Sequence, residues 1–395
     1  MKPQPSWLLW ALGFPSFFLS FLLLYWAVVL AVLTGHINPL RRRGRNDLFC
    51  TAKLMMDAMH VSVMQAGQQQ LCRAQCMYLA NHRSWADFFI DAYLTEGRAM
   101  PLSRGMVAVA FPALMLPLRA VGAVLVFNKA KGVKDVEAFN RWLDRELQRG
   151  GHSSLLVYPE GHRKAEAALQ PIKHGMLCFA YSRRLPIQVV MSANKEEVLS
   201  EKDDMARWGQ TVVASCSEPL DPAKFPSSQE FAGAVQEAWE TEWARVTTTP
   251  LAGLPSWVAS PALLDYSPSQ QLTSLALHCL CAAALSSALY CTFVAATWVA
   301  HALAAVQAAL PLLAAGSLLA WAGMSAWLAA SPVGARGGLP VGGAGGPEVA
   351  AGAACKAQAP AAGAIGGSLV GRGVLDSAAE EPQAVHIGLK AGKEE

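Results

Sequence analysis

The stretch that decides the fold runs from residue 77 to residue 87 and reads MYLANHRSWAD. Its first four residues, Met77–Ala80, are apolar, as in a short buried strand. His82 follows the end of this strand, and Asp87 comes five residues later, where a helix is expected to begin. At about 100° per residue, these two side chains would face different sides of a single helix. We therefore expect His82 to lie in the turn before the helix, with Asp87 reaching back from the first helical turn.

A histidine held by a carboxylate is a common arrangement for a general base. The carboxylate selects one imidazole tautomer and stabilises the imidazolium that forms during proton transfer. We predict His82 as the base and Asp87 as the residue that orients it. In the alternative interpretation, His82 is a capping or core histidine and Asp87 is a surface acid. Asp91, one turn further on, is predicted to be a surface acid, and Ser84 is predicted to cap the helix rather than act as a nucleophile.

A second polar segment, YPEGHRK at residues 158–164, also follows an apolar strand candidate. Gly161 provides a turn, and Arg163 and Lys164 place positive charge at the carboxyl end of the strand. Such a loop suits an anionic ligand.

The region from residue 46 to residue 245 reads as one α/β domain with a central mixed sheet covered by helices. Residues 136–148 predict an amphipathic helix, because apolar side chains recur on one face and charged ones on the other. Besides Met77–Ala80, the predicted strands are Ala123–Phe127, Ser154–Tyr158, Ile187–Met191 and Val212–Ser215.

Composition indicates a membrane protein. Charged residues make up 15% of the 395 residues and hydrophobic residues 53%, whereas a soluble domain has about 25% charged residues. Residues 1–45 are predicted as a membrane segment with a basic flank: Trp7–Leu33 carries no charge and, at about 40 Å, exceeds the ~30 Å hydrocarbon core. It must tilt, kink or turn back, with Gly13 and Pro15 as the natural break points. Arg41–Arg43 and Arg45 follow, and the positive-inside rule places them in the cytosol.

Three further segments are expected after the domain. Residues 246–271 are a linker rich in proline and serine, and residues 331–395 are an Ala/Gly-rich tail expected to be disordered. Between them, Leu272–Ala300 and Ala302–Ala330 are apolar and separated by His301, which predicts a transmembrane hairpin.

Other classes of protein fit less well. A net charge of +3 is too small for a nucleic-acid-binding protein. The nine cysteines lack the paired spacing of a zinc site. His82, Asp87 and Asp91 are not joined by further clustered ligands, so we predict no metal.

Taken together and in this order, the motifs resemble the glycerolipid acyltransferase family, which includes the 1-acylglycerol-3-phosphate acyltransferases. The resemblance covers about residues 75–215 and rests on four motifs: Asn81–Asp87, Gly122–Lys129, Glu160–Arg163 and Leu185–Val190. The chain departs from the family pattern in three places. His162 stands where the family usually has threonine, Lys129 falls one position late, and Val189 replaces a proline.

The resemblance implies direct transfer of an acyl group from acyl-CoA, the co-substrate, with no bound cofactor. His82 would take the proton of the acceptor hydroxyl, and the oxygen would attack the thioester. No G-x-S-x-G elbow is present to supply a serine nucleophile. The substrate-binding residues that the resemblance implies are Arg163, Glu160, Gly161, Lys129 and Arg104.

The expected reaction is acylation of 1-acyl-sn-glycerol 3-phosphate, a lysophospholipid, to phosphatidic acid. One alternative is an acyltransferase or transacylase that acts on another lysophospholipid, and a second is a catalytically silent membrane scaffold. We expect a multi-pass protein of the endoplasmic reticulum, with its catalytic domain in the cytosol.

Overall fold

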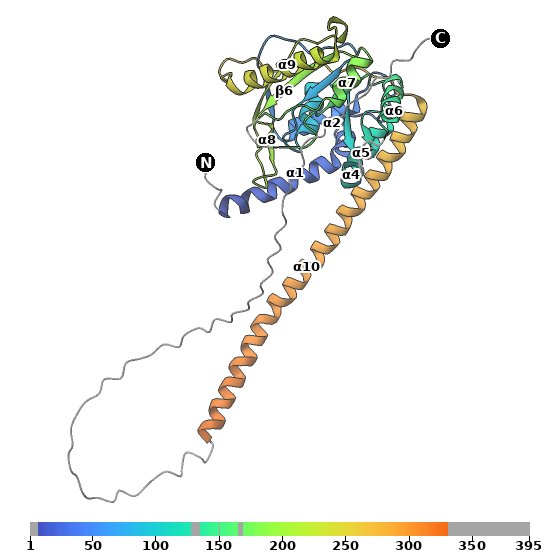
Figure 1. The fold of residues 1–395 in the computed structure, drawn as a ribbon. Coiled ribbons are helices and arrows are strands. Elements are labelled where there is room, and N and C mark those ends of the chain that lie inside the picture. Colours follow the sequence, from blue (N-terminus) through green and yellow to red (C-terminus); the bar gives the residue numbers. More distant parts are fainter. Residues whose placement is uncertain (1–6, 128–134, 150, 165–168, 331–395) are drawn as a thin grey trace, which may run out of the picture. The chain divides into compact units, whose positions relative to one another are not determined.

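The computed structural model describes residues 7–127, 135–149, 151–164 and 169–330. The chain divides into two compact units, Met1–Leu312 and Leu313–Glu395, and the first contains all the strands described below (Figure 1).

Nine strands and ten α-helices are found in the described residues. The helices are α1 (Trp7–Leu33), α2 (Asp47–Ala58), α3 (Asp87–Leu94), α4 (Gly105–Ala110), α5 (Pro112–Ala120), α6 (Val136–Gln148), α7 (Gly175–Ser182), α8 (Lys195–Val198), α9 (Ser228–Thr248) and α10 (Pro268–Ala330). The strands are β1 (Ser62–Gln65), β2 (Met77–Ala80), β3 (Ala99–Arg104), β4 (Leu125–Phe127), β5 (Ser154–Val157), β6 (Ile187–Ala193), β7 (Leu199–Ser200), β8 (Met205–Ala206) and β9 (Thr211–Cys216).

Seven strands form one sheet in the order β1-β9-β6-β2-β5-β3-β4, and β7 and β8 form a separate hairpin. All neighbours in the large sheet are parallel except β6 and β9. The prediction of a mixed α/β sheet is therefore confirmed. In the register, Leu79 of β2 lies between Val157 of β5 and Val189 of β6, so these three strands end at the same edge.

The sheet is buried on both faces. Successive residues of a strand point to opposite faces, and accordingly Tyr78 and Ala80 of β2 join one hydrophobic cluster, whereas Met77 and Leu79 join the other. Helices α1, α2, α3 and α5 contribute to the first cluster, and α6, α7 and α9 contribute to the second. This double cover explains why β2, β5 and β6 read as continuous apolar runs.

Two strands of the large sheet, β1 and β3, were not predicted. β3 contains Pro101 and ends in serine and arginine, a composition that argues against a strand. β1 has four residues, two of them polar. The predicted helix at residues 136–148 is α6, with the predicted bounds.

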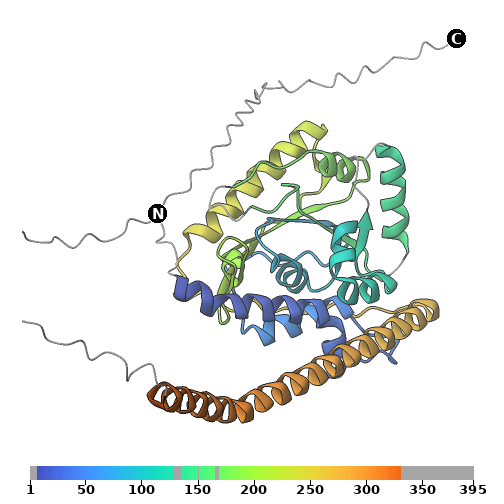
Figure 2. The same cartoon turned by 90° about the horizontal axis from the view of Figure 1, so that it is seen from below.

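Helix α1 also has the predicted bounds, but it does not turn back at Gly13 or Pro15. Contacts with the β7–β8 hairpin hold this part of the helix: the Ser16 hydroxyl donates to the carbonyl of Ala206 at 2.9 Å. Figure 2 shows α1 lying along the sheet domain rather than projecting from it. α1 is thus part of the first unit.

The predicted linker between α9 and α10 packs against the sheet domain. Its backbone forms bridges from Ser256 to Met64 and from Leu264 to Arg45, and the side chains of Trp257, Leu264 and Tyr266 are buried. The apolar residues spaced among its prolines and serines complete the first hydrophobic cluster.

The predicted hairpin at residues 272–330 is wrong, because α10 is one continuous helix. His301 is flanked by alanines, which favour the helix, and no glycine or proline stands there to end it. At about 1.5 Å per residue, α10 is roughly 95 Å long, about three times the ~30 Å hydrocarbon core.

Arg45 does not share the exposed basic cluster in which the sequence placed it. Its guanidinium is buried and donates two hydrogen bonds of 2.5 Å to Asp47, at the start of α2, and one of 3.3 Å to Ser274 of α10. The bidentate pair therefore joins the segment after α1 to α2 and to the first turns of α10.

The packed segment before α10 offers a stability test with adjacent residues. Leu264 is 8% exposed and Leu263 is 76% exposed. We expect Leu264→Ala to lower the free energy of unfolding by about 2–5 kcal/mol, because it leaves a cavity. The same change at Leu263 should stay within about 0.5 kcal/mol. Denaturant unfolding of both variants in detergent checks this, and equal stabilities would show that the segment does not contribute to the core.

Candidate active site

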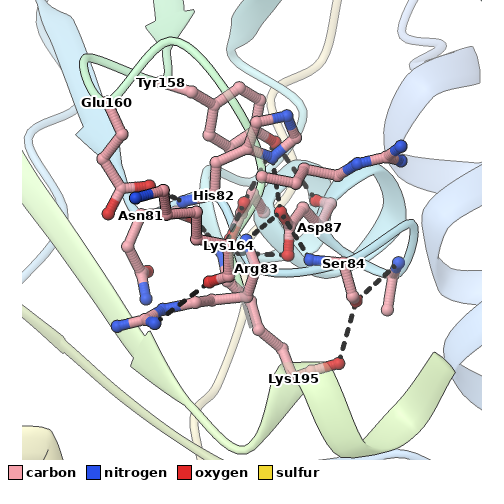
Figure 3. Close-up of polar contacts among 12 residues, drawn as sticks. Asn81, His82, Arg83, Ser84, Asp87, Tyr158, Glu160, Lys164 and Lys195 are labelled. Atoms are coloured by element: carbon pink, nitrogen blue, oxygen red, sulfur yellow. Dashed lines mark hydrogen bonds and ion pairs between the residues drawn. The ribbon is translucent and has the colours of Figure 1, made fainter. Parts of the chain in front are cut away.

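The polar residues of the two motifs gather where parallel strands end. His82 follows β2, Glu160 follows the neighbouring β5, and Lys195 follows β6 on the other side. The carboxyl ends of adjacent parallel strands form the usual ligand crevice of an open α/β sheet. Figure 3 shows these residues directed toward one another at this edge.

His82 and Asp87 make the contact that their spacing predicted. The imidazole Nδ1 lies 2.6 Å from Asp87 Oδ2. The same carboxylate oxygen accepts hydrogen bonds from the backbone N–H groups of Arg83, at 2.6 Å, and Ser84, at 3.1 Å. Because an ionised carboxylate only accepts hydrogen bonds, Nδ1 carries the imidazole proton. Nε2 therefore keeps its lone pair and is the atom able to take a proton from a substrate.

The surroundings of His82 favour the neutral imidazole. Burial lowers the pKa of His82, and this effect outweighs the hydrogen bond and charge of Asp87, which act to raise it. The ring also stacks on Tyr158, with 4.2 Å between ring centroids. The side chain remains 25% exposed, so a substrate can reach it. A neutral, oriented and accessible imidazole has the properties of a general base.

Asp91 is not the surface acid that we predicted. It is fully buried, and its carboxylate accepts hydrogen bonds from Lys195 Nζ at 2.8 and 3.0 Å and from the Tyr158 hydroxyl at 3.0 Å. Residues four apart lie on the same face of a helix, so Asp91 points the same way as Asp87. The spacing of four residues could have predicted that Asp91 joins the site. That prediction requires knowing that this face of α3 is directed toward the site.

Lys195 was not predicted as part of the site. Its ammonium lies 3.4 Å from Asp87 Oδ1 and donates a 2.5 Å hydrogen bond to the carbonyl of Asn81. Burial alone would raise the pKa of Asp87, but the nearby ammonium and the hydrogen bond with His82 hold it below its usual value. For Asp91, burial prevails, and its pKa is raised. The ion pair of Asp91 with Lys195, at 2.8 Å, acts against this effect, and Asp87 is the more readily ionised of the two carboxylates.

Asn81 and Ser84 hold the backbone around the base. Asn81 exchanges hydrogen bonds with the backbone of Ser192 at 2.7 and 3.1 Å, which joins the ends of β2 and β6. The Ser84 hydroxyl accepts from the N–H of Ala86 and donates to the carbonyl of Lys195. Ser84 thus orders the turn before α3, and its hydroxyl is buried rather than offered as a nucleophile.

Two of the predicted substrate-binding residues, Glu160 and Gly161, shape the loop that follows β5. Glu160 accepts a 2.7 Å hydrogen bond from the backbone N–H of His82, and burial raises the pKa of its carboxyl to about 7. Gly161 has φ +83°, and the space beside its Cα is filled by the side chain of Lys173. Its carbonyl accepts a 2.7 Å hydrogen bond from Arg104, which brings a second arginine to this loop.

Arg163 lies over the ring of Trp85 at 3.8 Å and pairs with Glu201 at 3.2 Å. Its side chain is partly exposed, so an incoming anion can reach it. Trp85 belongs to the same turn as His82, which places the guanidinium beside the base. The remaining predicted residue, Lys129, lies outside the described residues.

A metal-dependent site finds no support in the described ranges, where no group of three or more potential ligands occurs. The Asp91 carboxylate that could have joined His82 and Asp87 as a ligand is instead bound by Lys195. The described cysteines are all free thiols.

Comparisons with known proteins agree with this geometry. Residues 62–192 match the sequence model of a family described as "Acyltransferase". Residues 62–192 therefore form an acyltransferase domain, which agrees with the resemblance that the motifs predicted. The match begins at β1 and ends within β6, so this acyltransferase domain includes His82, Asp87, Asp91 and Arg163.

Two individual proteins are similar to the chain. The 1-acyl-sn-glycerol-3-phosphate acyltransferase of Saccharomyces cerevisiae is 23% identical over 190 residues, 47% of this chain and 60% of the yeast protein. The chain thus matches less than two thirds of that relative's length. The crystal structure of PlsC, the 1-acyl-sn-glycerophosphate acyltransferase of Thermotoga maritima, aligns with a TM-score of 0.46 and 15% identity. The alignment covers 60% of this chain and 95% of PlsC.

The acyltransferase site predicts the effect of removing the base. We expect His82→Ala and Asp87→Ala to lower the acyl-transfer rate by about 10²–10⁴-fold, the usual contribution of a general base. His174→Ala is the matched control, because His174 is an exposed histidine at the start of α7. Initial rates with folded, purified variants check the expectation. Near-normal turnover by His82→Ala would remove His82 from the mechanism.

Proposed function

We propose that the protein transfers a fatty acyl group from acyl-CoA to the free hydroxyl of 1-acyl-sn-glycerol 3-phosphate, giving phosphatidic acid. The observation that carries the proposal is the His82–Asp87 contact of 2.6 Å beside two arginines, Arg104 and Arg163. The yeast relative, which carries the name of this activity, supports the proposal.

The reaction follows from the tautomer of His82. Nε2 takes the proton from the acceptor hydroxyl as the oxygen forms a bond to the thioester carbonyl carbon. The carbon–sulfur bond then breaks, and the leaving CoA thiolate takes the proton from the imidazolium. Asp87 stabilises the imidazolium between these two steps. No acyl-enzyme is formed, in keeping with the buried Ser84 hydroxyl.

A phosphomonoester acceptor fits the charges beside the base. It carries nearly two negative charges at neutral pH, and its oxygens suit the planar fork of a guanidinium. Arg163 is held by Glu201 in a partly exposed pair, and such a pair contributes only about 0–1 kcal/mol. A phosphate dianion can therefore replace Glu201 as the partner of Arg163. A choline or ethanolamine lysophospholipid would gain less, because its diester carries one charge and its head is cationic.

Both the acceptor and the product of the proposed reaction are membrane lipids. By length and composition, Gly13–Leu33 of α1 and Pro268–Ala326 of α10 can cross a bilayer. α1 also exposes Phe14, Phe18 and Leu22, and α4 exposes Met106 and Val109. We propose that these apolar side chains enter the lipid, which is that of the endoplasmic reticulum.

The acceptor assignment is tested at Arg163. Arg163→Ala should raise the KM for lysophosphatidic acid by about 10–100-fold, the equivalent of a charge-assisted hydrogen bond of roughly 1.5–3 kcal/mol. kcat should change little, because the contact exists in both the ground and transition states. Initial-rate kinetics with each substrate varied in turn provide the measurement.

The control is Arg183→Ala, which removes an arginine that pairs with Asp144 on α6. It should leave both Michaelis constants unchanged. If Arg163→Ala weakens only acyl-CoA binding, Arg163 binds the donor instead. Equal wild-type rates with lysophosphatidylcholine would defeat the preference for lysophosphatidic acid, and the lack of transfer to any lysophospholipid would support the scaffold alternative.

The basic flank predicts the orientation of the catalytic unit. Arg41–Arg43 follow α1 closely, so residues 46–245 should face the cytosol. Protease added to sealed microsomes should digest this region without detergent. Its protection until the membrane is dissolved would reverse the assigned orientation.

A further inference from the structure

Lys195 is a cation enclosed by the active site. Its side chain has no exposed surface. Its ammonium contacts three acceptors: the carbonyl of Asn81 at 2.5 Å, the carboxylate of Asp91 at 2.8 Å and that of Asp87 at 3.4 Å. A buried ammonium is stable only where such partners replace its lost hydration. Burial acts to lower the pKa of Lys195, but the two aspartates prevail and raise it, so the side chain stays charged.

The backbone on either side of the Lys195 side chain is fixed by the fold. Asn194 before it has φ +71°, a left-handed conformation that non-glycine residues seldom adopt and that turns the chain sharply at the end of β6. The backbone carbonyl of Lys195 accepts a 3.0 Å hydrogen bond from Ser84, in the turn of the base. The backbone of Lys195 is thus joined to the turn after β2, and its ammonium contacts Asp87 and Asp91 of α3.

The net charge of the cluster formed by His82, Asp87, Asp91 and Lys195 favours proton uptake by His82. When Asp91, paired with Lys195 at 2.8 Å, is ionised together with Asp87 and Lys195 is protonated, the net charge beside the neutral imidazole is −1. Protonation of His82 during catalysis brings the cluster to neutrality. In a low-dielectric site, the interaction energy between these charges is larger than it would be in water. Without Lys195, two buried carboxylates would face each other and one would take up a proton.

We infer that Lys195, together with Asp91, sets the proton affinity of His82 through the carboxylate of Asp87. Lys195 is then a positioning residue for the base, since it acts through Asp87 rather than on a substrate. The inference deepens the proposed function and rests on it for its catalytic meaning.

Other groups also face the imidazole. They are Asp87 and Asp91 of α3, Tyr158, Glu160 and Arg163 of the loop after β5, and Lys195 of α8. The guanidinium of Arg83, in the same turn as His82, lies over the ring of Trp243 instead, at 4.3 Å. Arg163 is partly exposed and paired with Glu201, so solvent screens its charge. Glu160 contacts the backbone N–H of His82 rather than its ring. Among these groups, Lys195 and Asp91 are fully buried and carry opposite charges that can be removed separately or together.

The test compares Asp91→Asn with the double variant Asp91→Asn/Lys195→Met. The pKa of His82 is measured by NMR titration of its ring signals, which are assigned by their loss in His82→Ala, and the pH dependence of kcat/KM is measured alongside. Asp91→Asn should lower the pKa of His82 by up to about one unit, because Lys195 is then balanced by Asp87 alone. The acid limb of the rate profile should move to lower pH.

Removal of the ammonium in the double variant should return both readouts close to their wild-type values. A merely structural lysine would change the unfolding temperature but would not move the titration back. The double variant also avoids the two uncompensated carboxylates that Lys195→Met alone would leave buried. Equal His82 pKa values in Asp91→Asn and the double variant would overturn the inference.

A matched control lies on α2, where Lys53 and Asp57 form an exposed ion pair. Asp57→Asn and Asp57→Asn/Lys53→Met change the charge of the protein in the same way. Neither should shift the titration of His82, because exposed charges are screened. Since the titration needs no turnover, a wild-type protein that fails to acylate lysophosphatidic acid would count against the proposed function and leave the charge coupling testable by itself.

Discussion

The parallel pairing of β2 with β5 and β6 is the constraint on which the site depends. Parallel strands present their carboxyl ends at one edge. The register of Leu79 with Val157 and Val189 aligns the ends of β2 and β5, and β6 continues beyond them to Ala193. The base, the loop of Arg163 and the turn before Lys195 each follow one of these strands. Both faces of the strands are covered by helices, and the polar side chains of the site lie at the edge where the strands end.

Charged side chains are buried at the same edge, at a cost in free energy of desolvation. Asp87, Asp91 and Lys195 are all within the core, and ions in such a position need partners with good geometry. Here the partners are one another, the carbonyl of Asn81 and the hydroxyl of Tyr158. Replacing such a cluster with apolar residues often stabilises a protein, so its presence is better explained by the chemistry of His82 than by the stability of the fold.

The candidate membrane helix α1 is built into the first unit. The second half of α1 supplies core residues such as Leu24 and Val28, whereas its first half exposes phenylalanines. Phe21 of α1 packs against Trp85, which is in the turn of the base and supports Arg163. Helix α1, a candidate membrane helix, is thus two contacts away from the arginine proposed to bind the headgroup.

Residues 77–87 determined by themselves the strand, the turn and the partnership of His82 with Asp87, because these depend on local periodicity and a spacing of five residues. Only the tertiary structure decided the rest of the site. Lys195 is 104 residues from Asp91 along the chain, and no local pattern marks a lysine that a sheet will bury; Asp91 likewise looks like any helical surface acid until the face of α3 is known. At residues 272–330, composition fits a hairpin and a single helix equally well, because apolar side chains favour both. Turns and long-range charge pairs are settled by which elements pack together, and that information is spread over the whole chain.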